Sequence, residues 1–303
     1  MSKFIVTGAS GWMGRVTLKY LRDELGVDLQ SDVHCFSSTG KKIFLPGGEE
    51  LASRPFSEIL NMNKKMCGIF HFAFLTRDFV SQIGFDNYVK TNKEILKIID
   101  RALLQIEFDW IVSISSGAVF DFPGGKLSDE ISKNPYGFLK FEEEYLVQTH
   151  ARNHGATSVV GRLWGCTGEI MPVDRKYAIS DFIYQALTTE NINVIADYEV
   201  WRRYIDGQDF IRILHQIALM GKSTVVDSSG DLIEVGLLAK KIAERIGSTV
   251  SRPKISELMP KDLYYPSGDE MNSYLEKSGT TILGIDEQID KTIDGHRRQL
   301  FSQ

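Results

Sequence analysis

Ser116, Tyr136 and Lys140 are residues whose types and spacing could do chemistry. Tyr136 and Lys140 are four residues apart, so on a helix they share one face. A tyrosine with a pKa of about 10 is a poor base at neutral pH, but a nearby ammonium stabilises the phenolate and lowers that pKa. With the hydroxyl of Ser116 on the same reacting oxygen, these groups could pass a proton to or from a carbinol while a hydride moves to or from a nicotinamide. A Tyr and a Lys at this spacing are also common on exposed helices, so the prediction depends on what the rest of the chain places around them.

A glycine-rich turn near the start of the chain predicts the dinucleotide site that such chemistry needs. The run Thr7-Gly8-Ala9-Ser10-Gly11-Trp12-Met13-Gly14 follows an apolar, β-branched segment and precedes a stretch with helical spacing. Gly8 permits a tight turn, Gly11 lets the backbone approach a pyrophosphate, and Gly14 lets the helix pack closely on the strand. The helix N-terminus offers N–H groups and a partial positive charge to that pyrophosphate. Three glycines can also simply mark a turn, but their place between a strand and a helix favours the binding function. The cofactor contacts expected from this run are Gly8, Ser10, Gly11, Trp12, Met13 and Gly14.

The segment after the second predicted strand, residues 32–36, bears on which dinucleotide is bound. In dinucleotide-binding folds an acid at this point bonds the ribose 2′-hydroxyl and repels a 2′-phosphate. Here Ser37, Ser38 and Lys41 follow the strand, and no acid does. Hydroxyls and lysines favour a 2′-phosphate, so the segment predicts NADP slightly over NAD. A solvated turn whose lysines point to water would have the same composition.

The polar residues around the next predicted elements lie where a parallel sheet binds its ligands. Residues 65–74 and 110–114 have the continuous apolar character of strands buried on both faces. Ser115 and Ser116 follow the second of these, at its carboxyl end, although serines there could also be turn formers. Asn134 and Pro135 predict the N-cap and the first residue of the helix that carries Tyr136 and Lys140. His71 is expected to be a core histidine without a catalytic role.

Composition excludes several other classes of protein. The 303-residue chain has a formal net charge of −5 and scattered Lys and Arg, which gives no sign of nucleic-acid binding. No apolar stretch is long enough to span a bilayer, and the start lacks a signal-peptide pattern. Cys35, Cys67 and Cys166 match no metal-binding spacing and are expected to be buried free thiols, which predicts a cytoplasmic protein without a bound metal.

The order of the elements predicts an α/β protein, a Rossmann doubly wound parallel sheet with a smaller C-terminal α/β substrate lobe. The dinucleotide-binding domain is expected over residues 1–165, with a returning segment at about 203–228. The substrate lobe is expected over residues 166–202 and 229–303. Within the second half, the patterns predict strands at 193–196 and 223–227 and helices at 232–246 and from about residue 286.

Taken in order, the motifs resemble those of the extended short-chain dehydrogenase/reductases. More narrowly, they resemble the NAD(P)-dependent nucleotide-sugar epimerase/dehydratase branch, from residue 3 to about residue 285. The motifs that carry the resemblance are Thr7-Gly8-x-x-Gly11-x-x-Gly14, His71-x-Ala73, Asn92, Ser115-Ser116-x-x-Val119-Phe120, Tyr136-x-x-x-Lys140 and Arg202-x-Tyr204-Ile205-x-x-x-Asp209.

The resemblance implies a role for each matching position. It implies that Tyr136 is the acid/base, that Lys140 also bonds the nicotinamide ribose, and that Ser116 orients the reacting oxygen. Arg202 would bind the nucleotide diphosphate of the substrate, which its bidentate fork suits. The helices around residues 86–105 and 136–152 would pair across a two-fold axis into a homodimer. The cofactor contacts implied beyond the glycine turn are Phe72, Ala73, Asn92, Ser115, Tyr136 and Lys140.

Departures from the branch narrow the reaction. The 4,6-dehydratases have an Asp-Glu pair directly after the catalytic hydroxyl, whereas Gly117 and Ala118 stand here, so elimination lacks its acid and base. GDP-fucose-synthase-like enzymes place a cysteine in this region, and Gly117 argues against their C3/C5 epimerisation. The second diphosphate-binding arginine expected just before Gly268-Asp269 is also missing, which weakens the assignment of a nucleotide diphosphate.

Three functions remain open on the sequence. The first is an NAD(P)-dependent epimerase of a nucleotide-diphosphate sugar that transiently oxidises one ring carbinol, with C4 favoured. The second is an NADPH-dependent ketoreductase of a 4-keto sugar or another small carbonyl compound. The third is a dinucleotide-sensing regulator without catalysis, although such proteins usually lose the tyrosine or the lysine. An epimerase leaves no net change in the cofactor, whereas a reductase consumes NADPH stoichiometrically.

Overall fold

The computed structural model describes residues 3–62, 64–121, 125–173, 177–256 and 258–301. The chain divides into two compact units. Unit 1 comprises Met1–Leu163 and Ile211–Val226, and unit 2 comprises Trp164–Phe210 and Asp227–Gln303. None of the described helices combines the length and the apolar character needed to cross a bilayer.

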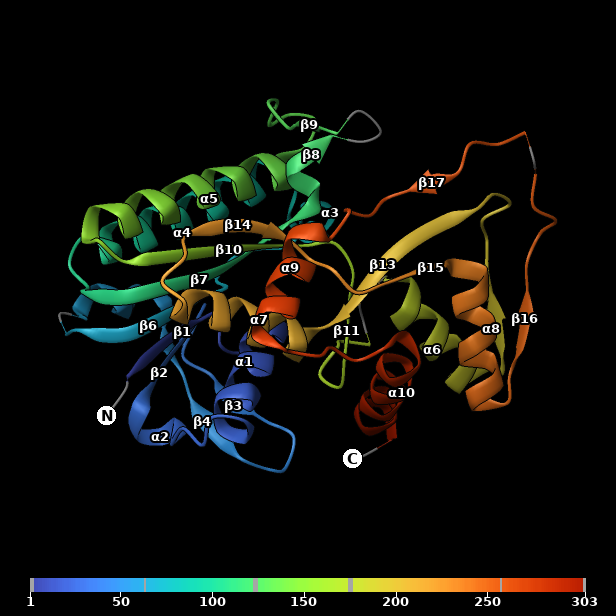
Figure 1. Ribbon diagram of the computed structural model, residues 1–303, viewed down its shortest axis with the longest axis horizontal. Helices are drawn as coiled ribbons and strands as arrows, with labels where there is room; N and C mark the ends of the chain where they lie inside the picture. The colour runs from blue at the N-terminus through green and yellow to red at the C-terminus, as the bar shows by residue number, and fades with distance from the viewer. Residues whose placement is uncertain (1–2, 63, 122–124, 174–176, 257, 302–303) are drawn as a thin grey trace. The chain divides into compact units, whose positions relative to one another are not determined.

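Unit 1 is built on a parallel sheet, which in the described part of the chain has seven strands in the order β14-β10-β7-β6-β1-β2-β5 (Figure 1). Its strands are β1 (Phe4–Thr7), β2 (Val33–Ser37), β5 (Arg54–Pro55), β6 (Met66–His71), β7 (Phe108–Ser116), β10 (Thr157–Leu163) and β14 (Thr224–Asp227). Its longer helices are α1 (Trp12–Asp23), α4 (Phe85–Leu103), α5 (Pro135–His154) and α7 (Gly207–Leu219), the last of which begins in unit 2. The shorter elements are α2 (Leu29–Asp32), α3 (Phe79–Ile83), the 3-10 helices Phe56–Asn61 and Gly117–Val119, and the strands β3 (Lys42–Phe44), β4 (Glu50–Ala52), β8 (Phe120–Asp121) and β9 (Lys126–Leu127). The prediction of a Rossmann-like α/β fold is confirmed.

The strand order reverses between β1 and β6, and this reversal positions the site. From β1 the chain moves outward through β2 to β5, then returns to β6 on the other side of β1. Ile5 of β1 is therefore in register with His34 of β2 on one side and with Ile69 of β6 on the other. In open parallel sheets, the carboxyl ends of the strands at such a reversal are where ligands bind.

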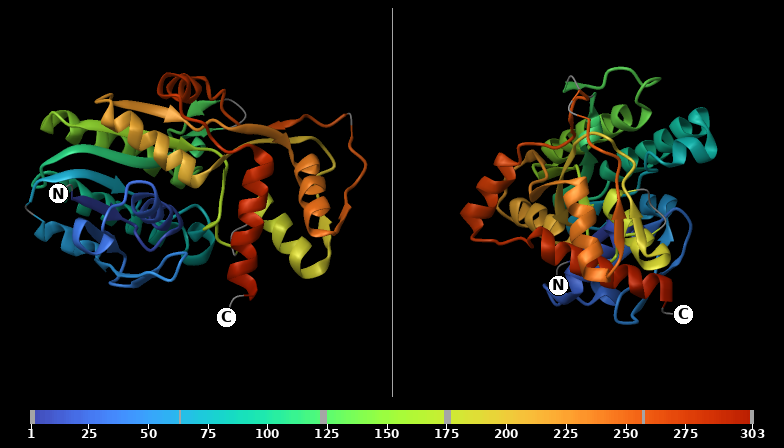
Figure 2. Two further views of the ribbon diagram at one scale, coloured as in Figure 1. Left: turned by 60° about the horizontal axis from the view of Figure 1, so that its bottom comes forward. Right: turned by 90° about the vertical axis from the view of Figure 1, so that its right-hand side faces the viewer.

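Alternate residues of the central strands form two separate cores. Ile5, Ile69 and Ile111 are fully buried in a cluster with residues of α4 and α5, which lie side by side on one face of the sheet (Figure 1). On the other face, Phe70 and Trp110 pack edge to face with ring centroids 5.0 Å apart, in a cluster that includes His215 of α7. Figure 2 shows the same layers from two further sides. Strands that are apolar on both faces explain the continuous apolar runs in the sequence.

Most elements lie where the sequence predicts them, and the exceptions have local causes. The strand expected at residues 32–36 begins at Val33, because Asp28 caps a short helix that takes Asp32. The helix expected from residue 232 begins at Val235, because residues 231–234 pair as a strand with β13 and Glu234 then caps the helix. The strand expected at 193–196 is instead Asn191–Asn193. All three cysteines are free, but Cys67 is half-buried rather than buried as expected.

Unit 2 contains a smaller sheet flanked by helices. Its strands are β11 (Cys166–Thr167), β12 (Asn191–Asn193), β13 (Val200–Asp206), β15 (Asp231–Glu234), β16 (Thr249–Ser251) and β17 (Asp262–Leu263). Its helices are α6 (Ala178–Thr189), α8 (Val235–Ile246), α9 (Asp269–Ser278) and α10 (Ile285–Phe301).

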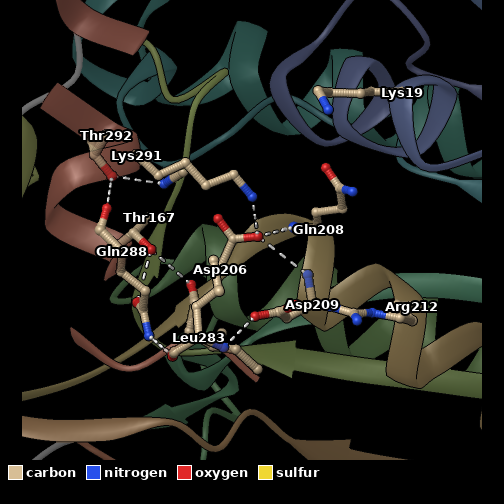
Figure 3. Close-up of polar contacts among 12 residues, drawn as sticks. Lys19, Thr167, Asp206, Gln208, Asp209, Arg212, Leu283, Gln288, Lys291 and Thr292 are labelled. Carbon is tan, nitrogen blue, oxygen red and sulfur yellow. Dashed lines mark hydrogen bonds and ion pairs between the residues drawn. The ribbon is translucent and has the colours of Figure 1, made fainter. Parts of the chain in front are cut away.

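Polar side chains fix α10 to β11 and β13 inside unit 2 (Figure 3). Asp206, at the end of β13, is 1% exposed, and its Oδ1 accepts from Lys291 Nζ at 2.9 Å and from the backbone N–H of Gln208 at 2.9 Å. Thr167 Oγ1 donates to Gln288 Oε1 at 2.8 Å. A buried carboxylate is costly unless it is paired, so the position of α10 depends on these contacts.

We expect Lys291→Met to reduce the free energy of unfolding by about 2 kcal/mol, because it removes the cation from a buried carboxylate that keeps its backbone donors. Lys261→Met is the matched control, since Lys261 is 57% exposed where it pairs with Glu199. The control should change stability by less than about 0.5 kcal/mol. Urea unfolding followed by circular dichroism measures both, and equal losses would contradict the role given to Asp206.

Candidate functional site

Segments far apart in the sequence meet at the carboxyl edge of the sheet in unit 1. The turn after β1 touches the loop after β6, because the backbone N–H groups of Phe72 and Ala73 donate to Thr7 Oγ1 at 3.0 and 3.2 Å. The start of α5 is fixed to the end of β7, because Asn134 Nδ2 donates to the carbonyl of Ala118 at 2.7 Å. Ser115 and Ser116 end β7, and Tyr136 lies in the first turn of α5. The structure therefore brings the predicted residues of unit 1 to one edge.

The glycine turn has the geometry that a pyrophosphate needs. Gly8 has a φ of +65°, and a Cβ there would lie 2.7 Å from the carbonyl carbon of Phe72. A Cβ on Gly14 would lie 2.3 Å from the carbonyl oxygen of Gly8, so α1 packs against the turn too closely for a side chain at this position. Gly11 is the N-cap of α1 without a side-chain cap, and the first turn carries no acid. An uncapped, uncharged helix start beside a glycine turn fits an anion, and these residues fit a dinucleotide pyrophosphate.

The helix with Tyr136 and Lys140 begins as predicted. Asn134 is its N-cap and accepts from the backbone N–H of Gly137 at 2.9 Å, and Pro135 is its first residue. Tyr136 is half-buried, whereas Lys140 is 4% exposed. The two side chains therefore share the inner face of α5.

Taken together, the groups around Tyr136 do not lower its pKa, although the sequence predicts a lowered value. Burial raises the pKa of Tyr136 to about 12, a hydrogen bond with Ser116 lowers it in part, and the carboxylate of Glu143 raises it further. The expectation that Lys140 lowers this pKa is wrong for this arrangement, because the ammonium of Lys140 is paired elsewhere. Its Nζ lies 2.7 Å from Glu143 Oε2 and donates to the carbonyl of Ile114 at 2.9 Å. At neutral pH Tyr136 is therefore a neutral phenol.

Glu143 belongs to a buried chain of polar groups that the sequence reasoning missed. Its Oε1 lies 3.2 Å from His71 Nε2, and His71 Nδ1 lies 2.7 Å from Thr7 Oγ1. Burial opposes the charge of Glu143, but Lys140 and His71 hold its pKa below the usual value. His71 is fully buried in the core, as expected. The signal in the sequence was spacing, since Glu143 follows Tyr136 by seven residues and Lys140 by three, on the same helix face.

The two serines at the end of β7 offer different hydroxyls. Ser116 is half-buried, and its Oγ accepts from the backbone N–H of Ala118 at 3.1 Å while it also bonds Tyr136. Ser115 is 3% exposed, and its Oγ finds no hydrogen-bond partner in the described part of the chain. An orphaned buried hydroxyl at the carboxyl end of a strand fits a contact with a bound group.

Some predicted cofactor residues use their polar groups within the protein. Asn92 Oδ1 accepts from the backbone N–H of Leu75 at 2.8 Å, so its amide holds the loop after β6. Ser37 is 1% exposed, and its Oγ donates to the carbonyl of Thr39 at 2.7 Å. Ser38 and Lys41 are exposed. A 2′-phosphate would therefore find Ser38 and Lys41 accessible, whereas the Ser37 hydroxyl is already bonded.

Arg202 lies in unit 2 and is engaged by a carboxylate. Its Nη1 and Nη2 bond Asp262 Oδ1 and Oδ2 at 3.0 and 2.7 Å in a bidentate pair. The guanidinium carbon also lies 5.5 Å from the centre of the Tyr264 ring, which packs against Trp164 at 4.8 Å. The guanidinium expected to bind a diphosphate thus binds a carboxylate of the same chain, and a diphosphate would have to displace Asp262.

Comparisons with known proteins agree with this geometry. The sequence profile described as "NAD dependent epimerase/dehydratase family" matches residues 4–229. A comparison with curated protein sequences finds no match.

Solved structures share the fold over almost the whole chain. MoeE5 in complex with UDP-glucose and NAD is 22% identical, with a TM-score of 0.73 over 99% of this chain and 100% of that chain. UDP-N-acetylglucosamine 4-epimerase from Bacillus cereus is 16% identical, with a TM-score of 0.74 over 99% and 98% of the two chains. The enzyme of that name from Methanobrevibacter ruminantium, in complex with UDP-N-acetylmuramic acid, is 17% identical, with a TM-score of 0.73 over 99% of each chain.

We expect Gly14→Ala to reduce stability by about 1–3 kcal/mol and to weaken dinucleotide binding by at least about tenfold, because the added methyl forces α1 away from the turn. Gly284→Ala is the control, since a Cβ there would meet its neighbours at 3.7 Å or more. Isothermal titration with NAD and NADP, together with thermal unfolding, measures both effects. Wild-type affinity in Gly14→Ala would contradict the role of the turn.

Proposed function

Because the chain belongs to the NAD dependent epimerase/dehydratase family, we propose that it epimerises a nucleotide-diphosphate sugar by transient oxidation of one ring carbinol, with C4 favoured. It is an NAD(P)-dependent enzyme of the extended short-chain dehydrogenase/reductase type. The observation that carries the proposal is the hydrogen bond between Ser116 and Tyr136 at the carboxyl end of β7, beside the glycine turn.

The residues that would hold the dinucleotide line the edge of the sheet. The start of α1 and the turn at Gly8 to Gly14 would take the pyrophosphate, and Phe72, Ala73, Ser115 and Lys140 would face the nicotinamide half. When bound, the nicotinamide accepts a hydride from the carbinol carbon and can return it. Exposed Ser38 and Lys41, with no acid after β2, support NADP slightly over NAD.

Tyr136 and Ser116 handle the proton of the reacting oxygen. The hydroxyl of Ser116 would orient that oxygen, and the phenolate form of Tyr136 would take its proton during oxidation. The phenol so formed would give the proton back during reduction. Gly117 and Ala118 follow Ser116 directly and supply neither acid nor base, which supports epimerisation over elimination. The sugar nucleotides named for the similar structures support a nucleotide-sugar substrate, and Arg202 is the group in unit 2 suited to its diphosphate.

A ketoreductase is the second candidate, and the protonation of Tyr136 favours it. A phenol whose pKa is raised to about 12 is ready to give a proton to a carbonyl oxygen but is a weak base towards a carbinol. Reduction of a 4-keto sugar needs a hydride, which NADPH would supply, and one proton for the carbonyl oxygen, which the neutral phenol would supply.

We expect Tyr136→Phe to lower kcat by about 10²–10⁴-fold while dinucleotide binding is retained, because the ring stays but the proton donor is lost. Ligands released from the purified protein are first identified by mass spectrometry, and UDP-glucose and UDP-N-acetylglucosamine serve as probes. Constant absorbance at 340 nm with a changed sugar supports the epimerase, whereas stoichiometric loss of NADPH supports the reductase. Unchanged turnover in Tyr136→Phe would contradict both.

The outer face of α4 and α5 supports a homodimer. A groove of about 870 Å³ lies along these helices. Charged and polar side chains contribute to its lining, but most of the surface that lines it is apolar, with Phe141 38% exposed and Tyr145 72% exposed. A second copy of the chain, presenting the same two helices, would cover these side chains. The buried free thiols of Cys35 and Cys166 support a reducing compartment, which we take to be the cytoplasm.

We expect Tyr145→Glu to shift the protein from dimer to monomer, because a carboxylate would be buried in the groove without a partner. Light scattering coupled to size exclusion measures the mass. Tyr184→Glu is the control, since Tyr184 is 43% exposed on α6 and does not line the groove. A monomeric wild-type protein, or a dimer that persists in Tyr145→Glu, would be evidence against this interface.

A further inference from the structure

Lys140 forms a buried ion pair with a carboxylate of its own helix. Lys140 Nζ lies 2.7 Å from Glu143 Oε2, with both side chains no more than 5% exposed. The same ammonium donates to the carbonyl of Ile114 and lies 4.0 Å from the centre of the Phe74 ring. A lysine that acted on the phenol of Tyr136 as an uncompensated cation would not be held in this way.

Glu143 is fixed from its other side by the core of unit 1. Thr7 Oγ1 accepts from two backbone N–H groups, so its own proton points to Nδ1 of His71. His71 Nε2 faces Glu143 Oε1 at 3.2 Å, and these two atoms have no other partner in the described part of the chain. The chain Thr7–His71–Glu143–Lys140 thus joins β1, β6 and α5 and fixes the carboxylate against the ammonium.

Other charged and titratable groups near Tyr136 do not replace the lost cation. Glu143 disfavours the phenolate, and Arg77, which is exposed, favours it. Tyr88, fully buried on α4, is kept as a neutral phenol, chiefly by burial. Lys140 is therefore the cation closest in sequence to Tyr136 on the same helix face. The charge of Lys140 is balanced by the carboxylate of Glu143.

We propose that Glu143 is a positioning residue that anchors and neutralises the ammonium of Lys140, so that Tyr136 rests as the neutral phenol and acts first as a proton donor. The catalytic consequence of this proposal rests on the second candidate of the proposed function, the ketoreductase, in which Tyr136 gives a proton to the carbonyl oxygen. Removal of the carboxylate would uncover the cation one helical turn from the phenol, lower the pKa of Tyr136 and increase the fraction of Tyr136 present as phenolate.

The test measures the titration of Tyr136 directly, without cofactor or substrate. The protein is labelled with ¹³Cζ-tyrosine, and the signal of Tyr136 among the 11 tyrosines is assigned with Tyr136→Phe. In wild type we expect no phenolate signal from Tyr136 up to a pH of about 10.5, since its pKa is raised to about 12. In Glu143→Gln we expect the midpoint to fall by about one to three pH units, so that the phenolate is present at that pH.

Two further variants separate positioning from a direct effect. Glu94→Gln, the same change on the exposed face of α4, should titrate as wild type. Lys140→Met combined with Glu143→Gln should show no phenolate at a pH of about 10.5, because no cation remains to be uncovered. A phenolate signal as strong in this double variant as in Glu143→Gln would show that Glu143 does not act through Lys140. An unchanged titration midpoint in Glu143→Gln would overturn the proposal outright.

The test stays decisive if Glu143→Gln does not fold. Glu143→Asp keeps the charge but withdraws it from Lys140 by one methylene, so a smaller fall of the midpoint is expected, and no fall overturns the proposal. Methyl spectra at each pH confirm that the variants are folded. Once a substrate is identified, the falling limb of kcat/KM against pH, which reports the loss of the Tyr136 proton, should move to lower pH in Glu143→Gln. If Tyr136→Phe keeps its turnover, the proposed function is wrong, but the effect of Glu143 on the titration of Tyr136 is unaffected.

Discussion

The buried ion pair between Lys140 and Glu143 is the interaction on which the site in unit 1 depends. Taking two charges out of water costs several kcal/mol per ion, and their attraction offsets this cost only when the remaining polar atoms are also satisfied. Here the carbonyl of Ile114 accepts a hydrogen bond from the ammonium, whereas the second oxygen of the carboxylate has only the approach of His71 Nε2 at 3.2 Å in the described part of the chain. The pair thereby connects α5 to β7 and, through His71 and Thr7, to β6 and β1. Side chains that must act together are held by the same charges that influence their protonation.

The topology of the sheet makes this connection possible. Since β1 and β6 are neighbours at the reversal of strand order, Thr7 and His71 lie in register, and the turn that follows one touches the loop that follows the other. The N-cap of α5 bonds the chain just after β7, which places Tyr136 next to Ser116. None of these residues is near the others in sequence, and the carboxyl edge of a parallel sheet is what brings them together.

Unit 2 follows the same electrostatic rule with a different result. Asp206 is fully buried where it pairs with Lys291 and fixes a helix, whereas both partners of the Arg202–Asp262 pair are at least one-quarter exposed. Exposed pairs contribute little to stability and exchange readily with other partners. The bidentate geometry of Arg202 with Asp262 is also the geometry with which a guanidinium binds a phosphate, so the contact marks a residue equipped for an anion.

The sequence by itself determined the elements and their order, because those depend on local patterns. Continuous apolar runs gave the buried strands, Asn134 and Pro135 gave the start of α5, and the glycine spacing gave the strand, turn and helix at the N-terminus. Local pattern also misassigned residues 232–234, whose strand conformation comes from pairing with β13 rather than from their own periodicity. The tertiary structure alone decided the electrostatics of the site. That Lys140 faces Glu143, that His71 supports Glu143 and that Asp262 engages Arg202 are contacts between side chains whose directions the sequence leaves open, and the pKa of Tyr136 follows from the sum of such charges and of burial.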